Sequence, residues 1–120
     1  FMIYGHPDVK GRDYEFTPRS VPGAKNPPML DRLCHGVDLS GISDDEAIAG
    51  GVNLAYLIDA YRDLGIGDKF FTAFFEKLIG RGDIRTMIEH GMDARAIAAT
   101  WADDVRVFKD RRRPYLLYAE

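Results

Sequence analysis

Three polar side chains, Arg19, Lys25 and Asn26, lie within the segment EFTPRSVPGAKNPP, residues 15–28. They offer two cations and one amide, groups that bind ligands through charge and hydrogen bonds. The segment also contains four prolines, which restrict the backbone and lower the entropy lost when a loop becomes ordered. The three residues could therefore belong to a rigid binding loop. They could equally be solvated side chains that keep a surface loop in water.

Carboxylates could supply glycoside hydrolysis, which needs two carboxyl groups flanking one bond, or one carboxyl with another nucleophile. The first half of the chain holds several near expected turns or strand edges: Asp8, Asp13, Glu15, Asp31 and Asp38. Nothing in their spacing singles out a pair. Asp38 is the most interesting, because its place in an alternating segment puts it opposite the expected core face. An exposed aspartate on a strand is nevertheless ordinary.

Other chemistries lack their residue patterns. His6, His35 and His90 are scattered, with no His-x-x-x-His or paired cysteines, so we expect neither a metal nor a cofactor. Cys34 stands alone, which excludes an intrachain disulfide and favours a small buried apolar side chain over a nucleophile. No Gly-x-Ser-x-Gly elbow occurs. The Gly-rich turn at residues 80–83 follows an aromatic helical stretch and ends in an aspartate, which would repel phosphate.

The composition is that of an ordinary globular domain. The 120 residues can bury a core as one domain, and the net charge of −3 gives no support for a nucleic-acid surface. No apolar run approaches the roughly 20 residues needed to span a bilayer. The sequence opens with Phe1 inside an apolar run, so we interpret it as part of a longer protein.

The elements that would position these residues begin with short strands. Residues 1–4 and 14–17 form short strand-like runs, the second of which is stopped by Pro18. Residues 33–39 alternate, with Leu33, His35, Val37 and Leu39 on the expected core face and Cys34, Gly36 and Asp38 opposite.

Helical spacing takes over from about residue 43. Ser43 and Glu46 fit a capping box before a short helix that ends at Gly50-Gly51, and Asn53 can cap a helix that ends at Gly65 and Gly67. The four phenylalanines of residues 70–75 are expected on a short helix that faces the core.

Later elements follow the same rules. Asp83 is the expected N-cap of residues 84–90, and Asp93 that of one long helix to Arg112 with Ile97, Trp101, Val105 and Phe108 on one face. Three arginines at its end suit the helix dipole. Residues 115–118 read as a closing strand. The predicted fold class is α+β, a small, mostly antiparallel sheet packed against several helices.

The order of short motifs carries more information than any of them alone. YGHP is followed by FTPRSVPGAKNPP, CHGVDL, FFEKLIG, IRTMIEHG, a tryptophan and FKDRRRPYLLY. Together these resemble the C-terminal portion of the bacterial exo-β-N-acetylmuramidase family, over nearly the whole chain. The resemblance implies a peptidoglycan-degrading glycoside hydrolase that releases N-acetylmuramic acid from the non-reducing ends of peptidoglycan fragments. It further implies an auxiliary domain beside a larger Rossmann-like N-terminal domain that holds the catalytic glutamate.

The resemblance implies a ligand for the polar loop of residues 15–28, the muramic acid sugar. Muramic acid bears a lactyl carboxylate, which Arg19 and Lys25 could bind, while Asn26 could bond to an N-acetyl or hydroxyl group. His6 and Asp38 are further candidates for contact with the sugar. No catalytic residue carries over to this chain. The implied partners are a peptidoglycan-derived sugar and the N-terminal domain, with no nucleic acid and no membrane span, and an exported or periplasmic location is favoured.

Two other readings stay open. The chain could be a non-catalytic carbohydrate-binding or protein-interaction module, or a structural cap that shields an apolar surface of the larger domain.

Overall fold

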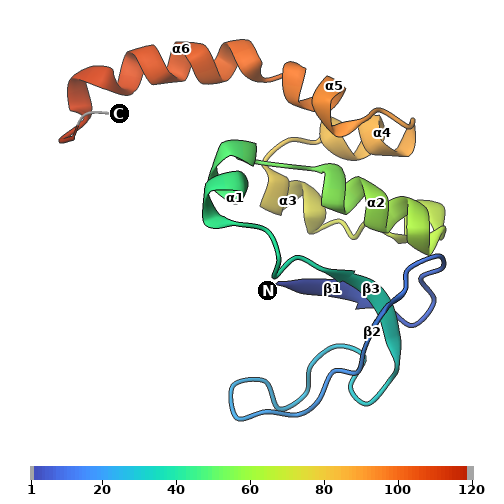
Figure 1. Ribbon diagram of the computed structural model, residues 1–120. Coiled ribbons are helices and arrows are strands. Elements are labelled where there is room, and N and C mark those ends of the chain that lie inside the picture. The colour runs from blue at the N-terminus through green and yellow to red at the C-terminus, as the bar shows by residue number, and fades with distance from the viewer. Residues whose placement is uncertain (1, 119–120) are drawn as a thin grey trace. The chain divides into compact units, whose positions relative to one another are not determined.

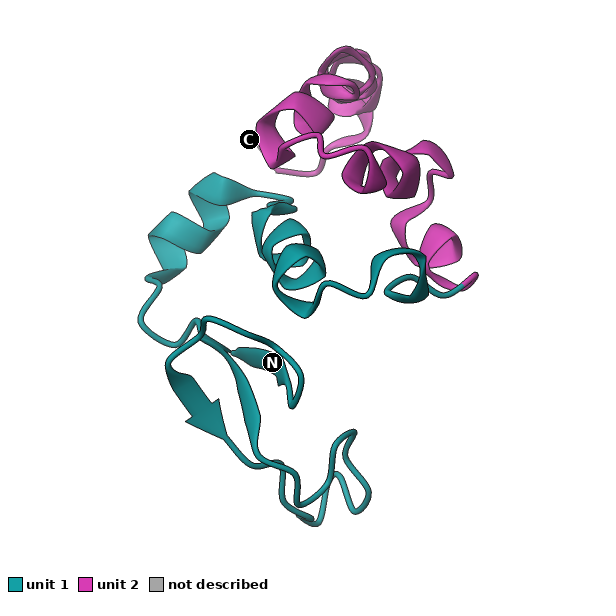
Figure 2. Ribbon diagram, turned by 90° about the vertical axis from the view of Figure 1, so that its right-hand side faces the viewer, with its two compact units in different colours: residues 1–72 teal, residues 73–120 magenta. Residues whose placement is uncertain are grey.

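The computed structural model describes residues 2–118, which fall into two compact units divided after Thr72: unit 1 before this point and unit 2 from Ala73 onward (Figure 2). The first unit holds the β-sheet and two α-helices, and the second is helical (Figure 1). This confirms the predicted α+β class.

The sheet of unit 1 is antiparallel and has the order β1-β3-β2. Strand β1 spans Ile3–His6, β2 spans Tyr14–Phe16, and β3 spans Cys34–Asp38 between them. These strands confirm the three predicted from the sequence, with β1 beginning two residues later than expected and Phe1 outside the described residues. Both β1 and β2 therefore lie at the edges of the sheet.

Two glycines let β1 and β3 approach each other. A Cβ atom on Gly36 would lie 1.9 Å from the carbonyl oxygen of Tyr4, and one on Gly5 would lie 2.3 Å from that of His35. Real Cβ atoms do not come so close to a backbone oxygen, so glycine is required at both positions. The local sequence thus fixes the pairing on which the rest of unit 1 is built.

The predicted core face of β3 was wrong in part. Cys34 and Gly36 are buried although they were placed opposite the core, whereas Leu33 is 52% exposed. The ring of Phe16 covers their side of the sheet, since its Cε1 atom lies 2.8 Å from the position of a Gly5 Cβ. The prediction that Cys34 is a small buried apolar side chain is confirmed.

Helices α1, Asp44–Gly50, and α2, Ala55–Leu64, follow the sheet, and their ends agree with the sequence signals. Ser43 Oγ accepts a hydrogen bond from the Glu46 backbone N–H at 3.2 Å, and Asn53 Oδ1 accepts one from Ala55 at 2.9 Å. Gly65 ends α2 in the left-handed conformation, at φ 64°. Ser43 thus caps α1 as predicted, whereas the N-cap of α2 is Leu54 and Asn53 bonds to the first helical N–H from one residue before it.

The predicted phenylalanine helix is wrong in part, because only Phe75 lies in a helix, α3 (Phe75–Ile79), which has Phe74 as its N-cap. A 3₁₀ turn, η1, spans Gly67–Lys69, and Phe70 and Phe71 follow it outside any helix. Their rings pack on Tyr61, with centroids 5.4 and 5.6 Å away. Gly67 has a positive φ of 57°, and the tight turn it begins directs both rings back to α2. Phe74 is 59% exposed and takes no part in this core.

Unit 2 consists of short helices. In chain order they are α3, Phe75–Ile79; α4, Asp83–Glu89; α5, Ala94–Ala99; α6, Ala102–Arg112; and a 3₁₀ turn η2, Arg113–Tyr115. The fully buried side chains are Ile84 and Ile88 of α4 and Ile97 of α5. Asp93 caps α5 as predicted, accepting a bond from the Ala96 N–H at 2.7 Å.

Two predictions for unit 2 were wrong at element boundaries. Asp83 is the first residue of α4 rather than its N-cap, because its carboxylate pairs with Arg81. The long helix from Asp93 is broken after α5, where the Thr100 hydroxyl donates to the Ile97 carbonyl at 2.7 Å and competes with the helical bond.

The last part of the chain also departs from expectation. Val105 and Phe108 of α6 are 45% and 57% exposed, so the apolar face predicted for this helix is not buried here. Residues 115–118 form no strand. The chain enters η2, which contains Pro114, and Leu117 beyond it is 89% exposed.

Candidate functional site

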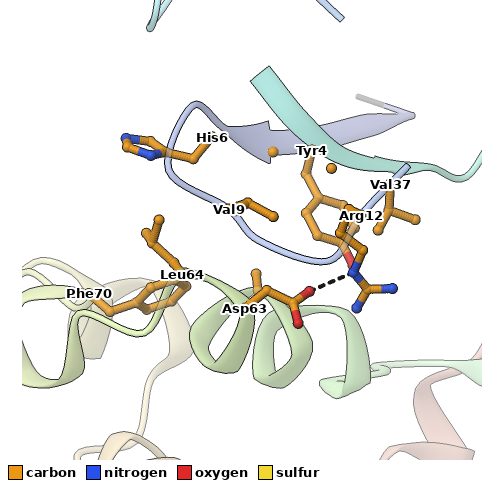
Figure 3. Close-up of a pocket in the computed structure, with 11 residues that line it drawn as sticks. Tyr4, His6, Val9, Arg12, Val37, Asp63, Leu64 and Phe70 are labelled. Carbon is orange, nitrogen blue, oxygen red and sulfur yellow. Dashed lines mark hydrogen bonds and ion pairs between the residues drawn. The ribbon is translucent and has the colours of Figure 1, made fainter. Parts of the chain in front are cut away.

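A cavity of about 250 Å³ lies in unit 1 between the β1–β3 pair and α2 (Figure 3). It is lined by Tyr4, Gly5, His6, Val9, Arg12, Gly36, Val37, Ala60, Asp63, Leu64 and Phe70. Most of these groups are apolar, and the polar ones are few, which is the usual composition of a pocket for a small organic group.

Local sequence explains why these residues meet. Tyr4 and His6 are two residues apart in β1, so they share one face of the strand. Val37 of β3 pairs in register with Tyr4. Asp63 and Leu64 come from the last turn of α2 (Figure 3). The cavity is thus bounded by a sheet face and a helix face.

An ion pair closes one side of the cavity. The Arg12 Nε–H donates to Asp63 Oδ2 at 2.6 Å, and both side chains are partly buried, 33% and 23% exposed. This bond raises the pKa of the Arg12 guanidinium above its ordinary value. The pair connects the β1–β2 loop to α2 across 51 residues of sequence. It is an anchor for that loop.

Tyr4 points from β1 toward this ion pair (Figure 3). Burial raises the pKa of its hydroxyl, and the nearby Asp59 and Asp63 raise it further, while Arg12 opposes them. The phenol therefore stays protonated at neutral pH and can donate a hydrogen bond into the cavity.

His6 is at the edge of the cavity, with its ring directed away from the ion pair (Figure 3). Its Nδ1 atom accepts a hydrogen bond from the Asp8 backbone N–H at 3.1 Å. In the neutral imidazole the proton is then on Nε2, which can donate to a ligand. The turn after β1 therefore engages Nδ1 of His6, which also lies 3.5 Å from Oδ2 of Asp8.

The other predicted site residues do not line the cavity. Arg19 is 70% exposed and donates to Asp31 Oδ1 at 2.8 Å, within the loop between β2 and β3. Lys25 and Asn26 are exposed in the same loop. A second bond at the base of this loop runs from the Asp31 N–H to the Pro18 carbonyl at 2.9 Å. We call residues 18–31 the clasped loop.

Asp38 is at the opposite end of the sheet from His6. It pairs in register with Ile3, whereas His6 pairs with His35. Asp38 Oδ1 accepts a hydrogen bond from the Ser40 backbone N–H at 2.8 Å, and this bond lowers the pKa of the carboxyl. The structure thus gives Asp38 a local role in the turn after β3 and does not bring all five predicted residues together.

The sequence missed the cavity and its ion pair. Neither Arg12 nor Asp63 is among the candidate residues that the sequence pointed to. No local spacing links the two residues. The available hint was the position of Asp63 directly before Leu64, next to the buried side of an amphipathic helix.

The lining residues include few groups that could act as acid or base. Asp63 is the one carboxylate among them, and it is engaged by Arg12. Glycoside hydrolysis calls for a second carboxyl or another nucleophile. Across residues 2–118 no group of three His, Cys, Asp or Glu side chains is placed to hold a metal ion, and no helix there is long and apolar enough to cross a membrane.

Comparisons with known proteins agree with the resemblance in the sequence. The sequence profile described as "Exo-beta-N-acetylmuramidase NamZ, C-terminal" matches residues 2–118. The peptidoglycan β-N-acetylmuramidase NamZ of Bacillus subtilis (strain 168) is 33% identical over 133 aligned positions, which cover 98% of this chain and 31% of that protein.

A solved structure gives the same result. The crystal structure of a DUF1343 family protein from Bacteroides fragilis NCTC 9343 superposes with a TM-score of 0.95 at 56% identity, covering 99% of this chain and 34% of that one. The chain therefore spans about a third of the length of both relatives. It belongs to the family of NamZ-type exo-β-N-acetylmuramidase C-terminal domains.

Proposed function

We propose that this chain is the C-terminal auxiliary domain of a longer, two-domain exo-acting β-N-acetylmuramidase. The full protein would release N-acetylmuramic acid from the non-reducing ends of peptidoglycan fragments, in an exported or periplasmic setting that serves cell-wall recycling. The observation that carries the proposal is the family match over residues 2–118, together with relatives about three times as long. Both compact units would belong to this one domain, and a Rossmann-like N-terminal domain would supply the catalytic glutamate.

In this proposal the chain contributes binding groups to the cleft beside the N-terminal domain. Arg19 is the main candidate for the lactyl carboxylate, since a guanidinium can hold a carboxylate through two hydrogen bonds. It already holds the carboxylate of Asp31. A substrate carboxylate would replace Asp31 in that pair, so the loop keeps the guanidinium oriented until the sugar arrives.

The backbone of the clasped loop supports a functional reading. Met29 and Asp31 have positive φ values of 57° and 59°, a backbone conformation that residues other than glycine rarely adopt. Such strain costs about 1–3 kcal/mol per residue and gathers at functional sites. Lys25 and Asn26 lie between the two ends of this loop, where they could contact the sugar's hydroxyl and N-acetyl groups.

The remaining candidates have smaller roles in the proposal. His6 Nε2 could donate to a sugar oxygen at the edge of the cavity, and the cavity itself has room for an acetyl or lactyl methyl group. Asp38 lies at the other end of the sheet from His6, so a peptidoglycan fragment would have to be longer to contact both residues.

Kinetics on the full-length protein test the role of Arg19. We expect Arg19→Ala to lower kcat/KM on a chromogenic N-acetylmuramic acid glycoside by about ten-fold or more, the value of a hydrogen bond to a charged group. Arg62→Ala is the matched control, because Arg62 is 68% exposed and is also 2.8 Å from a carboxylate, that of Asp59. Equal kinetics for the wild type and Arg19→Ala would refute the role.

A second candidate is a carbohydrate-binding or interaction module without enzymatic activity. It is favoured by the cavity, whose one carboxylate is held by Arg12. The two proposals differ in the full-length protein: release of N-acetylmuramic acid supports the enzyme, and binding of peptidoglycan fragments without release supports the module.

A further inference from the structure

The end of unit 2 presents large apolar side chains to solvent. Phe108 of α6 is 57% exposed, and Tyr115, Leu117 and Tyr118 after it are 84%, 89% and 85% exposed. Phe108 and Tyr115 line one groove of about 390 Å³ together with Arg111 and Arg112. We call Phe108, Tyr115, Leu117 and Tyr118 the C-terminal apolar surface. Phe108 and Tyr115 share this groove, and large apolar side chains that gather on a surface are typical of interaction sites.

Helix α6 lacks the packing that stabilises helices in proteins. It has 11 residues and buries none of them. An isolated helix of this length is marginal in water, and most helical stability comes from a packed face. Its described ion pairs, such as Arg106–Asp103 at 3.3 Å, are exposed and add little. The helix therefore needs a partner for its apolar face.

The composition of the surface is that of an interface core. Tyrosine, phenylalanine and arginine are enriched at such cores and supply most hot spots. Arg112 extends over the Phe108 ring at 5.9 Å, so a cation and an aromatic ring are arranged next to each other in the groove. A sugar would leave Leu117 without a suitable contact, whereas a protein surface can cover all four side chains.

We propose that the N-terminal portion of the same longer protein covers the C-terminal apolar surface. The inference rests on the two-domain organisation of the proposed function and assigns the surface through which the domains join. The chain accounts for 31% and 34% of its two relatives, and the family match is to a C-terminal domain, so a large N-terminal portion is available as the occupant.

Hydroxyl-radical footprinting of the full-length protein tests this directly, because it reports the solvent exposure of individual side chains. Phe74 is an internal control, being 59% exposed against 57% for Phe108. The two rings should be oxidised equally if the surface is open. We expect Phe108 to be oxidised several-fold more slowly than Phe74, and Tyr115 more slowly than Tyr56, which is only 36% exposed here.

A pair of leucine variants adds a second test. Leu117→Asp in the full-length protein should raise the oxidation of Phe108 and Tyr115. Leu78→Asp, a change at a 73% exposed position in α3, should leave both rates unchanged. Identical rates in the two variants would count against the proposed surface.

Further outcomes identify other occupants. Equal oxidation of Phe108 and Phe74 in the wild type overturns the proposal. Protection that disappears on dilution would point to a second copy, and protection that arises only with peptidoglycan fragments would point to the ligand; both overturn it. The muramidase activity is measured on the same sample. An active enzyme whose Phe108 is oxidised as fast as Phe74 refutes only this inference. An inactive protein whose Phe108 is protected refutes only the muramidase proposal.

Discussion

Breaking the ion pair between Arg12 and Asp63 should destabilise unit 1 more than breaking an exposed pair elsewhere. The Arg12 Nε–Asp63 Oδ2 distance is 2.6 Å, and the side chains are 33% and 23% exposed. A hydrogen bond between charged groups contributes about 1.5–3 kcal/mol, and the remaining exposure reduces this through solvent screening. We therefore expect a coupling of about 1 kcal/mol, equal to a shift of about 4 °C in Tm for a domain of this size.

A double-mutant cycle isolates this coupling. Arg12→Met, Asp63→Asn and the double variant are compared with the wild type by urea unfolding, which gives the free energy of unfolding and its denaturant slope. The matched control is the cycle on Arg106 and Asp103, which are 3.3 Å apart and 68% and 93% exposed. That pair should show a coupling of about 0–0.5 kcal/mol.

Salt provides an independent check. Screening should remove the coupling of the exposed pair as ionic strength rises, and it should weaken the coupling of Arg12 and Asp63 less, because partly buried charges are less screened. If both cycles gave the same coupling at low salt, the ion pair would not anchor the β1–β2 loop to α2, and the reasoning would be refuted.

Three further predictions concern single positions. Gly36→Ala should prevent the sheet from forming, seen as loss of the folded circular dichroism spectrum, since its Cβ would lie 1.9 Å from a carbonyl oxygen of β1; Gly23→Ala, with nothing within 4 Å, should be silent. Ile97→Ala, at a fully buried position, should cost about 2–5 kcal/mol in urea unfolding, and a cost near zero would contradict the described core of unit 2. The bond from Arg81 lowers the pKa of Asp83 below its ordinary 3.8. The stabilisation of the fold by this pair is therefore complete above pH 3.8 and is lost as the pH falls through the folded-state pKa of Asp83. In acid titrations of stability, Arg81→Ala should abolish this loss.

Features that depend on a few adjacent residues could be predicted from the sequence. Ser43 and Asp93 cap their helices as expected, because an N-cap needs only a short polar side chain and the backbone N–H groups that follow it. Gly65 ends α2 for a similarly local reason, its positive φ. The burial of Cys34 could be predicted because a lone cysteine forms no intrachain disulfide and is usually a small buried apolar side chain.

Features that depend on distant residues could not be predicted. Arg12 and Asp63 are 51 residues apart and meet only once β1 lies against α2. Residues 115–118 have the composition of a strand, but the 3₁₀ turn η2 with Pro114 includes Tyr115, and residues 116–118 pair with none of the described strands. The helix breaks at Thr100, where the hydroxyl bonds to the Ile97 carbonyl and competes with the backbone bond of the helix. The spacing of apolar residues carries no information about that bond.

The clasp between Pro18 and Asp31 has a consequence for how this family can vary. Because the bonds at the base hold the ends of the loop together, its length beyond the base has little effect on the register of β2 and β3, and each doubling of a loop costs only about 0.6 kcal/mol. The alignment with the Bacillus subtilis protein extends over 133 positions, more than the 120 residues of this chain, so the relative carries insertions. We expect such insertions to be tolerated within residues 20–30, where the sequence can diverge while the sheet stays the same.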